Sequence, residues 1–157
     1  MFSTPKRRSR SSAPDGFTLI ELIVSILIAV LLGALVMPSF IASVRKSRRA
    51  EAFAALAQVQ QAQERWRGNN PAYASLSDLG LPATTSNGYY DIAVTLVDTT
   101  KSTVYIATAT AKSGTSQASD SNCAILAARM QNGNLSYAGA AASIDWTSPD
   151  PNKCWPR

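Results

Sequence analysis

The sequence contains no histidine, the residue that proteins use most often as a general base and as a metal ligand. It also has no glycine-rich phosphate loop, no Gly-x-Ser-x-Gly motif and no Cys-x-x-Cys pair. Asp145 and Asp150 are acids in the C-terminal tail, but they lack the alternating oxygen ligands of a calcium loop. We therefore expect no enzymatic activity, no bound metal and no cofactor.

Net charge gives little support for a nucleic-acid partner. The 157 residues carry a formal net charge of +5, from 15 Lys and Arg against 10 Asp and Glu. Four of the basic residues precede residue 16, which leaves 11 basic and 9 acidic residues in the rest of the chain. Nucleic-acid binding would need a converging basic surface. The basic residues beyond residue 60 are scattered in sequence: Arg65, Arg67, Lys101, Lys112, Arg129, Lys153 and Arg157.

Residues 17–42 form a long apolar run in which Glu21 is the only charged side chain. About 20 apolar residues are enough for a helix to cross the hydrocarbon core of a bilayer. A charge at that depth costs roughly 2.5–3.5 kcal/mol, so a carboxylate there indicates a functional site. A secretory signal peptide fits poorly, because its apolar segment is only about 7–15 residues long. A plain uncleaved membrane anchor is the better alternative.

Residues 16–21, which read GFTLIE, resemble the cleavage and methylation motif of type IV prepilins and pseudopilins. The resemblance implies that a membrane peptidase cuts between Gly16 and Phe17 and methylates the new N-terminus. It also implies that Glu21 pairs with the N-terminal ammonium of a neighbouring subunit. Opposite charges attract strongly in a filament core of low dielectric constant, and each alone would be costly. Pro38 lies where many pilins have a proline, and we expect it to kink the helix.

The same resemblance implies a chain of three parts. Residues 1–16 would be a cleaved basic leader, residues 17–42 a transmembrane and filament-core helix, and residues 43–157 a globular head. We expect a single-pass inner-membrane protein with a cytoplasmic N-terminus, later built into an extracellular pilus. The implied partners are major and minor pilin subunits, the prepilin peptidase/methyltransferase, the inner-membrane assembly platform and membrane lipid. The basic cluster at residues 45–49 either contacts anionic lipid headgroups or forms a solvated collar.

The head is expected to be α+β. Residues 43–67 are rich in helix-forming residues and carry an apolar stripe at helical spacing, interrupted by Gln63. They extend the apolar run into one long N-terminal helix whose C-terminal half packs on a sheet. Residues 89–140 should supply roughly four antiparallel strands, whereas residues 111–122 should form an exposed loop. The strand patterns cover residues 89–97, 103–111 and 123–130, with a fourth strand beginning at 135–138.

Cys123 and Cys154 are the only two cysteines. In an exported chain an isolated pair usually forms a disulfide. Closing a loop of about 30 residues would stabilise the fold by roughly 3–4 kcal/mol. The resulting C-terminal loop resembles the disulfide-bounded region of type IV pilins, and we expect Trp155 to pack against the bond.

The function implied by this resemblance is structural: a subunit of a type IV pilus. Looser similarity in residues 63–67, in residues 119–123 and at the C-terminal end favours a minor pilin. Minor pilins of the family prime pilus assembly and support twitching motility, adhesion or DNA uptake. Three alternatives remain: a major pilin, a type II secretion pseudopilin and a DNA-binding competence pilin. The cysteine pair argues against the pseudopilin, and the competence pilin would need a basic surface bearing aromatic side chains.

Overall fold

The computed structural model describes residues 16–97 and 103–156. Its elements follow the order α1, β1, β2, η1, β3 and β4, where η1 is a short 3₁₀ helix. The predicted leader up to residue 15 and the predicted hairpin loop at residues 98–102 lie outside the described residues. The chain divides into two compact units at Pro38, and each is described by itself.

Helix α1 spans Leu19–Arg67. Just before it, the Thr18 hydroxyl accepts a hydrogen bond from the backbone N–H of Glu21 at 3.3 Å, which caps one of the unpaired donors of the first turn. The helix ends at Arg67, and the Gly, two Asn and Pro of residues 68–71 disfavour its continuation. Pro38 lies inside the helix. Its missing N–H removes one hydrogen bond of the ladder, but the helical conformation continues beyond it.

The first unit, up to Pro38, presents apolar side chains to its surroundings. Every residue of α1 from Leu19 to Pro38 is exposed in the isolated chain. The helix is long and apolar enough there to cross a membrane, by length and composition. A continuous apolar surface of this kind marks a segment that contacts lipid or other protein chains.

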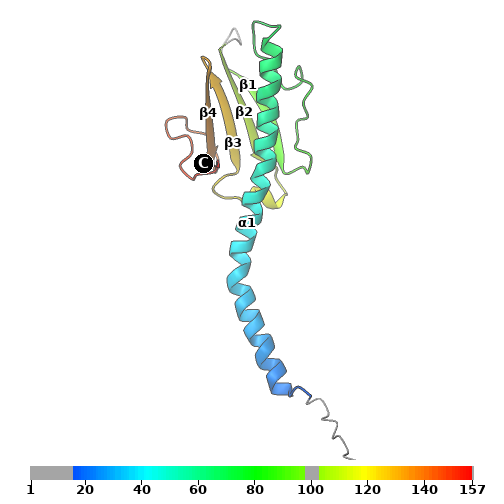
Figure 1. Ribbon diagram of the computed structural model, residues 1–157. Coiled ribbons are helices and arrows are strands. Elements are labelled where there is room, and N and C mark those ends of the chain that lie inside the picture. Colours follow the sequence, from blue (N-terminus) through cyan, green and yellow to red (C-terminus); the bar gives the residue numbers. More distant parts are fainter. Residues whose placement is uncertain (1–15, 98–102, 157) are drawn as a thin grey trace, which may run out of the picture. The chain divides into compact units, whose positions relative to one another are not determined.

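The second unit contains a four-stranded antiparallel sheet in the order β1-β2-β3-β4, so every strand pairs with the next one in the chain (Figure 1). The turn between the last two strands is Asn132-Gly133, where φ is 51° and 81°. Two central residues with positive φ are typical of the type I′ turns that match the twist of a hairpin. The predicted strands are confirmed, with boundary shifts of a few residues. The strands are Tyr90–Leu96, Val104–Ala111, Ile125–Gln131 and Asn134–Ala140.

The core lies between the second half of α1 and one face of the sheet (Figure 1). The expected stripe on the helix supplies buried Ala and branched side chains, and alternate residues of β2 and β3 meet it from the sheet. The long helix packed on an antiparallel sheet confirms the α+β fold. The fully buried members include Ala52, Leu56, Tyr90, Tyr105, Ala107, Ala109 and Leu126.

Gln63 lies on the same buried face of the helix and is not exposed at all. Its Nε2 donates to the carbonyl oxygen of Ala74 at 2.7 Å, and its Oε1 accepts from the Ala74 N–H at 3.0 Å. A buried amide is tolerated when its donors and acceptors are paired. The polar interruption of the stripe therefore attaches the segment after α1 to the helix.

Residues 111–122 are mostly exposed, as their Ser, Gly and Thr content predicts, but two of their side chains are buried. They contain η1, which spans Ser116–Ser119, and they bury Gln117 completely and Asp120 to 6 % exposure. The two buried positions were not predicted, because composition reports only the average polarity of a segment. It does not reveal that two of its polar side chains meet partners on a distant helix.

Candidate functional site

The processing motif lies at the start of the described chain. Gly16 and Phe17 precede α1 and are exposed, so a protease could reach the backbone between them without unwinding the helix. Glu21 is exposed in the first turn of α1. In the part of the chain that the structure describes, no side chain forms a hydrogen bond or an ion pair with its carboxylate. The predicted roles of these three residues remain predictions, and so does the kink at Pro38.

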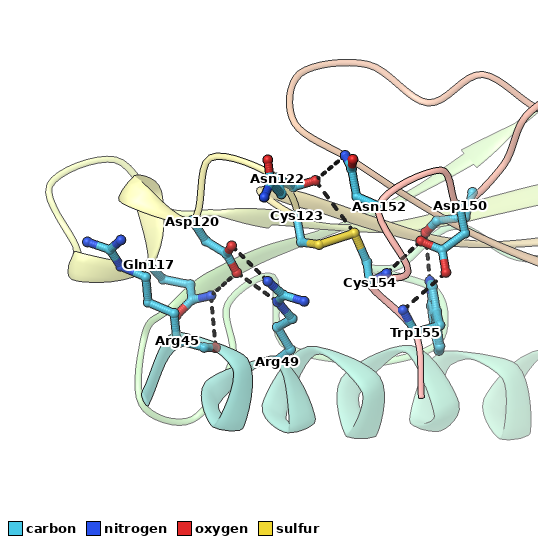
Figure 2. Close-up of a disulfide and its surroundings, with 11 residues drawn as sticks. Arg45, Arg49, Gln117, Asp120, Asn122, Cys123, Asp150, Asn152, Cys154 and Trp155 are labelled. Atoms are coloured by element: carbon cyan, nitrogen blue, oxygen red, sulfur yellow. Dashed lines mark hydrogen bonds and ion pairs between the residues drawn. A yellow bond between two sulfur atoms is a disulfide. The ribbon is translucent and has the colours of Figure 1, made fainter. Parts of the chain in front are cut away.

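Arg49 of α1 and Asp120 form a two-pronged ion pair (Figure 2). Arg49 Nε donates to Asp120 Oδ2 at 2.7 Å, and Arg49 Nη2 donates to Oδ1 at 2.8 Å. The two side chains are 12 % and 7 % exposed. Parallel hydrogen bonds between a guanidinium and a carboxylate are among the strongest polar contacts in proteins. Arg49 is therefore committed to the fold and does not belong to a solvated collar.

Gln117 completes this buried network, which Figure 2 shows between α1 and η1. Its Nε2 donates to Asp120 Oδ2 at 3.0 Å and to the carbonyl oxygen of Arg45 at 3.3 Å. Burial, together with the negative charge of Asp120, raises the pKa of the nearby Tyr90 to about 12. Burial also raises the pKa of Tyr105 above its ordinary value. Both tyrosines stay neutral at physiological pH and serve the core.

The predicted disulfide joins Cys123 and Cys154, whose Cα atoms are 5.6 Å apart (Figure 2). It passes directly beside Gly139 of β4. A Cβ atom added at Gly139 would lie 2.4 Å from Cys154 Cβ, well inside van der Waals contact. The backbone N–H of Gly139 donates to the carbonyl oxygen of Pro149 at 2.8 Å, so the tail closes on the last strand from both sides. Only glycine leaves room for this approach.

The C-terminal end is held by further contacts around the disulfide. Asp150 accepts hydrogen bonds from the backbone N–H groups of Cys154 at 2.7 Å and Trp155 at 3.3 Å. Trp155 Nε1 donates to the carbonyl oxygen of Ala138 at 2.7 Å. The ring of Trp155 lies 4.6 Å from that of Phe53 and 4.4 Å from that of Tyr137. The tail is thus packed between α1 and β4.

The acids of the tail are used in local hydrogen bonds. Asp145 accepts from the backbone N–H and the hydroxyl of Thr147, and these bonds lower its pKa. Asp150 caps the residues that follow it, as described above. Among residues 16–97 and 103–156, no group of three or more His, Cys, Asp or Glu is arranged to hold a metal ion.

Beyond residue 60, the basic side chains that the structure describes do not gather into one surface. Arg65 and Arg67 lie at the end of α1, whereas Lys112 follows β2 at the opposite end of the strands. Arg129 of β3 lies opposite Ile106, on the sheet face away from the helix. Lys101 and Arg157, which the sequence also suggested, lie outside the described residues.

Three arginines instead stack on aromatic rings, each in a different place. The guanidinium carbon lies 4.1–4.9 Å from the ring centroid in all three, a distance at which cation–π attraction is significant. The sequence did not predict these stacked pairs, because each ring is far from its arginine in the sequence or lies in a loop without periodicity. The pairs are Arg48 with Tyr89, Arg67 with Tyr73, and Arg129 with Trp146.

Two family models match the chain, and together they cover the motif and most of the head. The model described as "Prokaryotic N-terminal methylation motif" matches residues 14–37. The model described as "Type IV minor pilin ComP, DNA uptake sequence receptor" matches residues 38–127, more than half of the 157 residues. A search of the curated proteins finds no match. With its prepilin motif, long helix, antiparallel sheet and C-terminal disulfide, the chain belongs to the family of type IV minor pilins that the ComP model describes.

Proposed function

We propose that the chain is made as a membrane-anchored precursor, cut between Gly16 and Phe17, and incorporated as a minor subunit into a type IV pilus. The observation that carries this proposal is the pair of family matches, one over residues 14–37 and one over residues 38–127. Two structural features support it. The cleavage junction precedes the capped start of α1, and the apolar side chains that follow are unburied in the isolated chain.

In this proposal the chain keeps its three parts. Residues 1–16 are removed as the leader, residues 17–42 span the inner membrane and later enter the filament core, and residues 43–157 form the head. The N-terminus is cytoplasmic before assembly, and the disulfide-bearing head lies on the oxidising side. The partners are the prepilin peptidase, the assembly platform of the inner membrane and neighbouring pilin subunits.

Glu21 selects the position of a subunit in the filament. After cleavage the chain begins at Phe17 with a positive amino group, and Glu21 lies one helical turn further along. An unpaired carboxylate in an apolar filament core is costly, whereas a carboxylate paired with a neighbouring ammonium is favourable. The axial arrangement in which these charges meet is therefore preferred over arrangements shifted by a few residues.

Mass spectrometry of sheared filaments tests the assembly role. The wild type and Glu21→Ala are each expressed with the cell's own pilus machinery, and the subunit is quantified as a fraction of total pilin. We expect a trace fraction with an N-terminus at Phe17 for the wild type and a strongly reduced fraction for the variant. A dominant fraction would make the chain a major subunit. An uncut chain absent from filaments would contradict the proposal altogether.

We further propose that the head binds DNA during uptake. The observation that carries this step is the match to a family whose description names a DNA uptake sequence receptor. Residues 17–157 carry only two more basic than acidic side chains, so a broad basic surface is not expected. A local contact fits better. Arg129 and Trp146 form such a contact, because a stacked guanidinium and indole can offer a phosphate partner and an aromatic surface together.

Binding of a short DNA duplex by the full chain in mild detergent tests this contact. Arg129→Gln should weaken binding and reduce the slope of log affinity against log salt by about 0.9, the value for one lost phosphate contact on duplex DNA. Arg65→Gln removes an exposed positive charge at the end of α1 and serves as the matched control. Equal slopes for the two variants would place DNA elsewhere on the head. Absence of binding by the wild type would refute the DNA role and leave the filament role intact.

A further inference from the structure

A groove of about 350 Å³ lies in the second unit, beside the first turns of α1 in that unit. An apolar wall and two arginines both come from α1, and the first residue of η1 completes the lining. The apolar wall is accessible, since Phe40 is 61 % and Ile41 42 % exposed. The groove thus combines an apolar part with a cationic part. Its lining residues are Phe40, Ile41, Val44, Arg45, Arg48 and Ser116.

The two arginines are held in place by the head. Arg45 Nε donates to the carbonyl oxygen of Ser116 at 3.2 Å, and Arg48 Nη1 donates to the Ser116 hydroxyl. The guanidinium of Arg48 also lies over the ring of Tyr89, 4.5 Å from its centroid. A guanidinium carries five N–H donors, so each arginine retains donors beyond those that Ser116 accepts. Side chains fixed in this way lose less conformational entropy when they bind a ligand.

Arg45 and Arg48 differ from Arg49, the neighbouring arginine of the basic cluster. Arg49 is neutralised by Asp120, because its Nε and Nη2 both donate to the carboxylate. Arg45 and Arg48 contact a hydroxyl and a carbonyl oxygen, so their positive charge is not cancelled. Fixed arginines with uncancelled charge match the geometry of a phosphate group, which accepts bidentate hydrogen bonds.

The groove also lies at the level where a membrane surface is expected. The apolar run ends at residue 42, and the arginines follow within two turns of helix. Phe40 and Ile41 would reach the acyl region while Arg45 and Arg48 reach the headgroups, as long basic side chains near the end of a membrane helix commonly do. We propose that this groove binds the phosphate of an anionic phospholipid, with an acyl chain against the apolar wall.

This site requires the membrane anchoring proposed above but neither filament assembly nor DNA binding. A free phosphate ion would use the same arginines but would leave the apolar wall uncovered. Each basic residue near an anionic membrane surface contributes to binding, so removal of Arg45 and Arg48 together should weaken lipid binding roughly 30-fold. The lipid would hold the head against the bilayer before the subunit enters a filament.

Native mass spectrometry of the full chain, released from mild detergent in the presence of defined lipids, tests the site. Phosphatidylglycerol and phosphatidylcholine are offered in equal amounts, and retained adducts are counted. We expect the wild type to retain phosphatidylglycerol selectively and Arg45→Gln/Arg48→Gln to lose that selectivity. Lys46→Gln/Lys112→Gln removes the same charge from exposed positions outside the groove and should retain it.

A lysine variant and a competition with inorganic phosphate distinguish a lipid site from a site for a free anion. Arg45→Lys/Arg48→Lys keeps the charge but loses the planar donor array, so it should bind phosphatidylglycerol several-fold more weakly than wild type even if the Gln variant folds poorly. Inorganic phosphate at millimolar concentration should not displace the lipid. Displacement by phosphate would identify a free-anion site and overturn the lipid assignment. Equal retention of both lipids by the wild type, or equal loss in the two charge-matched variants, would also overturn it.

Discussion

Reduction of the Cys123–Cys154 bond should remove a large part of the stability of the head. The bond closes a loop over a sequence separation of 31 residues. The chain-entropy relation gives about 3.7 kcal/mol at 25 °C for a loop of that length. Domains of this size unfold with a free energy of about 5–15 kcal/mol, so the reduced head should be only marginally stable.

Urea unfolding of the full chain in mild detergent, followed by tryptophan fluorescence, measures this loss. Trp155 is a suitable reporter because it follows Cys154 directly and packs on α1 and β4. Oxidised and reduced wild type contain the same side-chain carbon and sulfur atoms, so their comparison avoids the cavity that a Cys→Ala change would create. We expect a decrease of about 3–4 kcal/mol in the free energy of unfolding. A decrease below about 1 kcal/mol would refute the reasoning from loop closure and indicate that the reduced, unfolded chain is already compact.

Three further predictions concern buried positions of the head. Arg49→Met should lower the free energy of unfolding by about 3 kcal/mol in urea titrations, because it leaves the buried charge of Asp120 unpaired. Adding Asp120→Leu should restore part of this loss, since an apolar pair costs less than an unpaired buried charge. Gly139→Ala should leave Cys123 and Cys154 as free thiols, since the added methyl group would occupy the position of Cys154. Alkylation followed by mass analysis detects these thiols. The free energy of unfolding should fall by roughly 3 kcal/mol between pH 10 and about 12, because Tyr90 ionises in that range in the unfolded chain but not in the folded one. Tyr90→Phe should flatten that part of the pH profile.

Each of these has a result that would contradict it. A double variant less stable than Arg49→Met would mean that the ion pair contributes no unfavourable desolvation. A fully oxidised Gly139→Ala chain would show that the tail can shift without cost. An unchanged alkaline profile in Tyr90→Phe would assign the pH dependence to other groups, of which Tyr105 is the first to examine, since its pKa is also raised.

The elements that could be predicted from sequence are those whose pattern is local. The helix stripe and the strand alternation each repeat within a few residues, so they were located to within a few positions. The processing motif at residues 16–21 is local as well. The cysteine pair could be predicted because two cysteines in an exported chain leave one intramolecular pairing.

The contacts that could not be predicted join residues far apart in the chain. Arg49 and Asp120 are separated by 71 positions, and nothing in the Ser-rich segment around Asp120 indicates a buried partner. Gly139 appears as an ordinary small residue in a strand until the position of Cys154 is known. The groove beside Ser116 has the same origin, because Ser116 orients two arginines that are about 70 positions earlier in the sequence.

The strand order has a consequence for how the chain matures. Because β1, β2, β3 and β4 pair strictly in succession, each new strand can add to the strand that precedes it in the chain. Cys123 lies just before β3 and Cys154 lies in the tail after β4, so the β3–β4 hairpin and the contacts of the tail on β4 together bring the two sulfurs close. With two cysteines in the whole chain there is no wrong intramolecular pair to correct. The subunit should therefore mature with a thiol oxidase alone, without a disulfide isomerase.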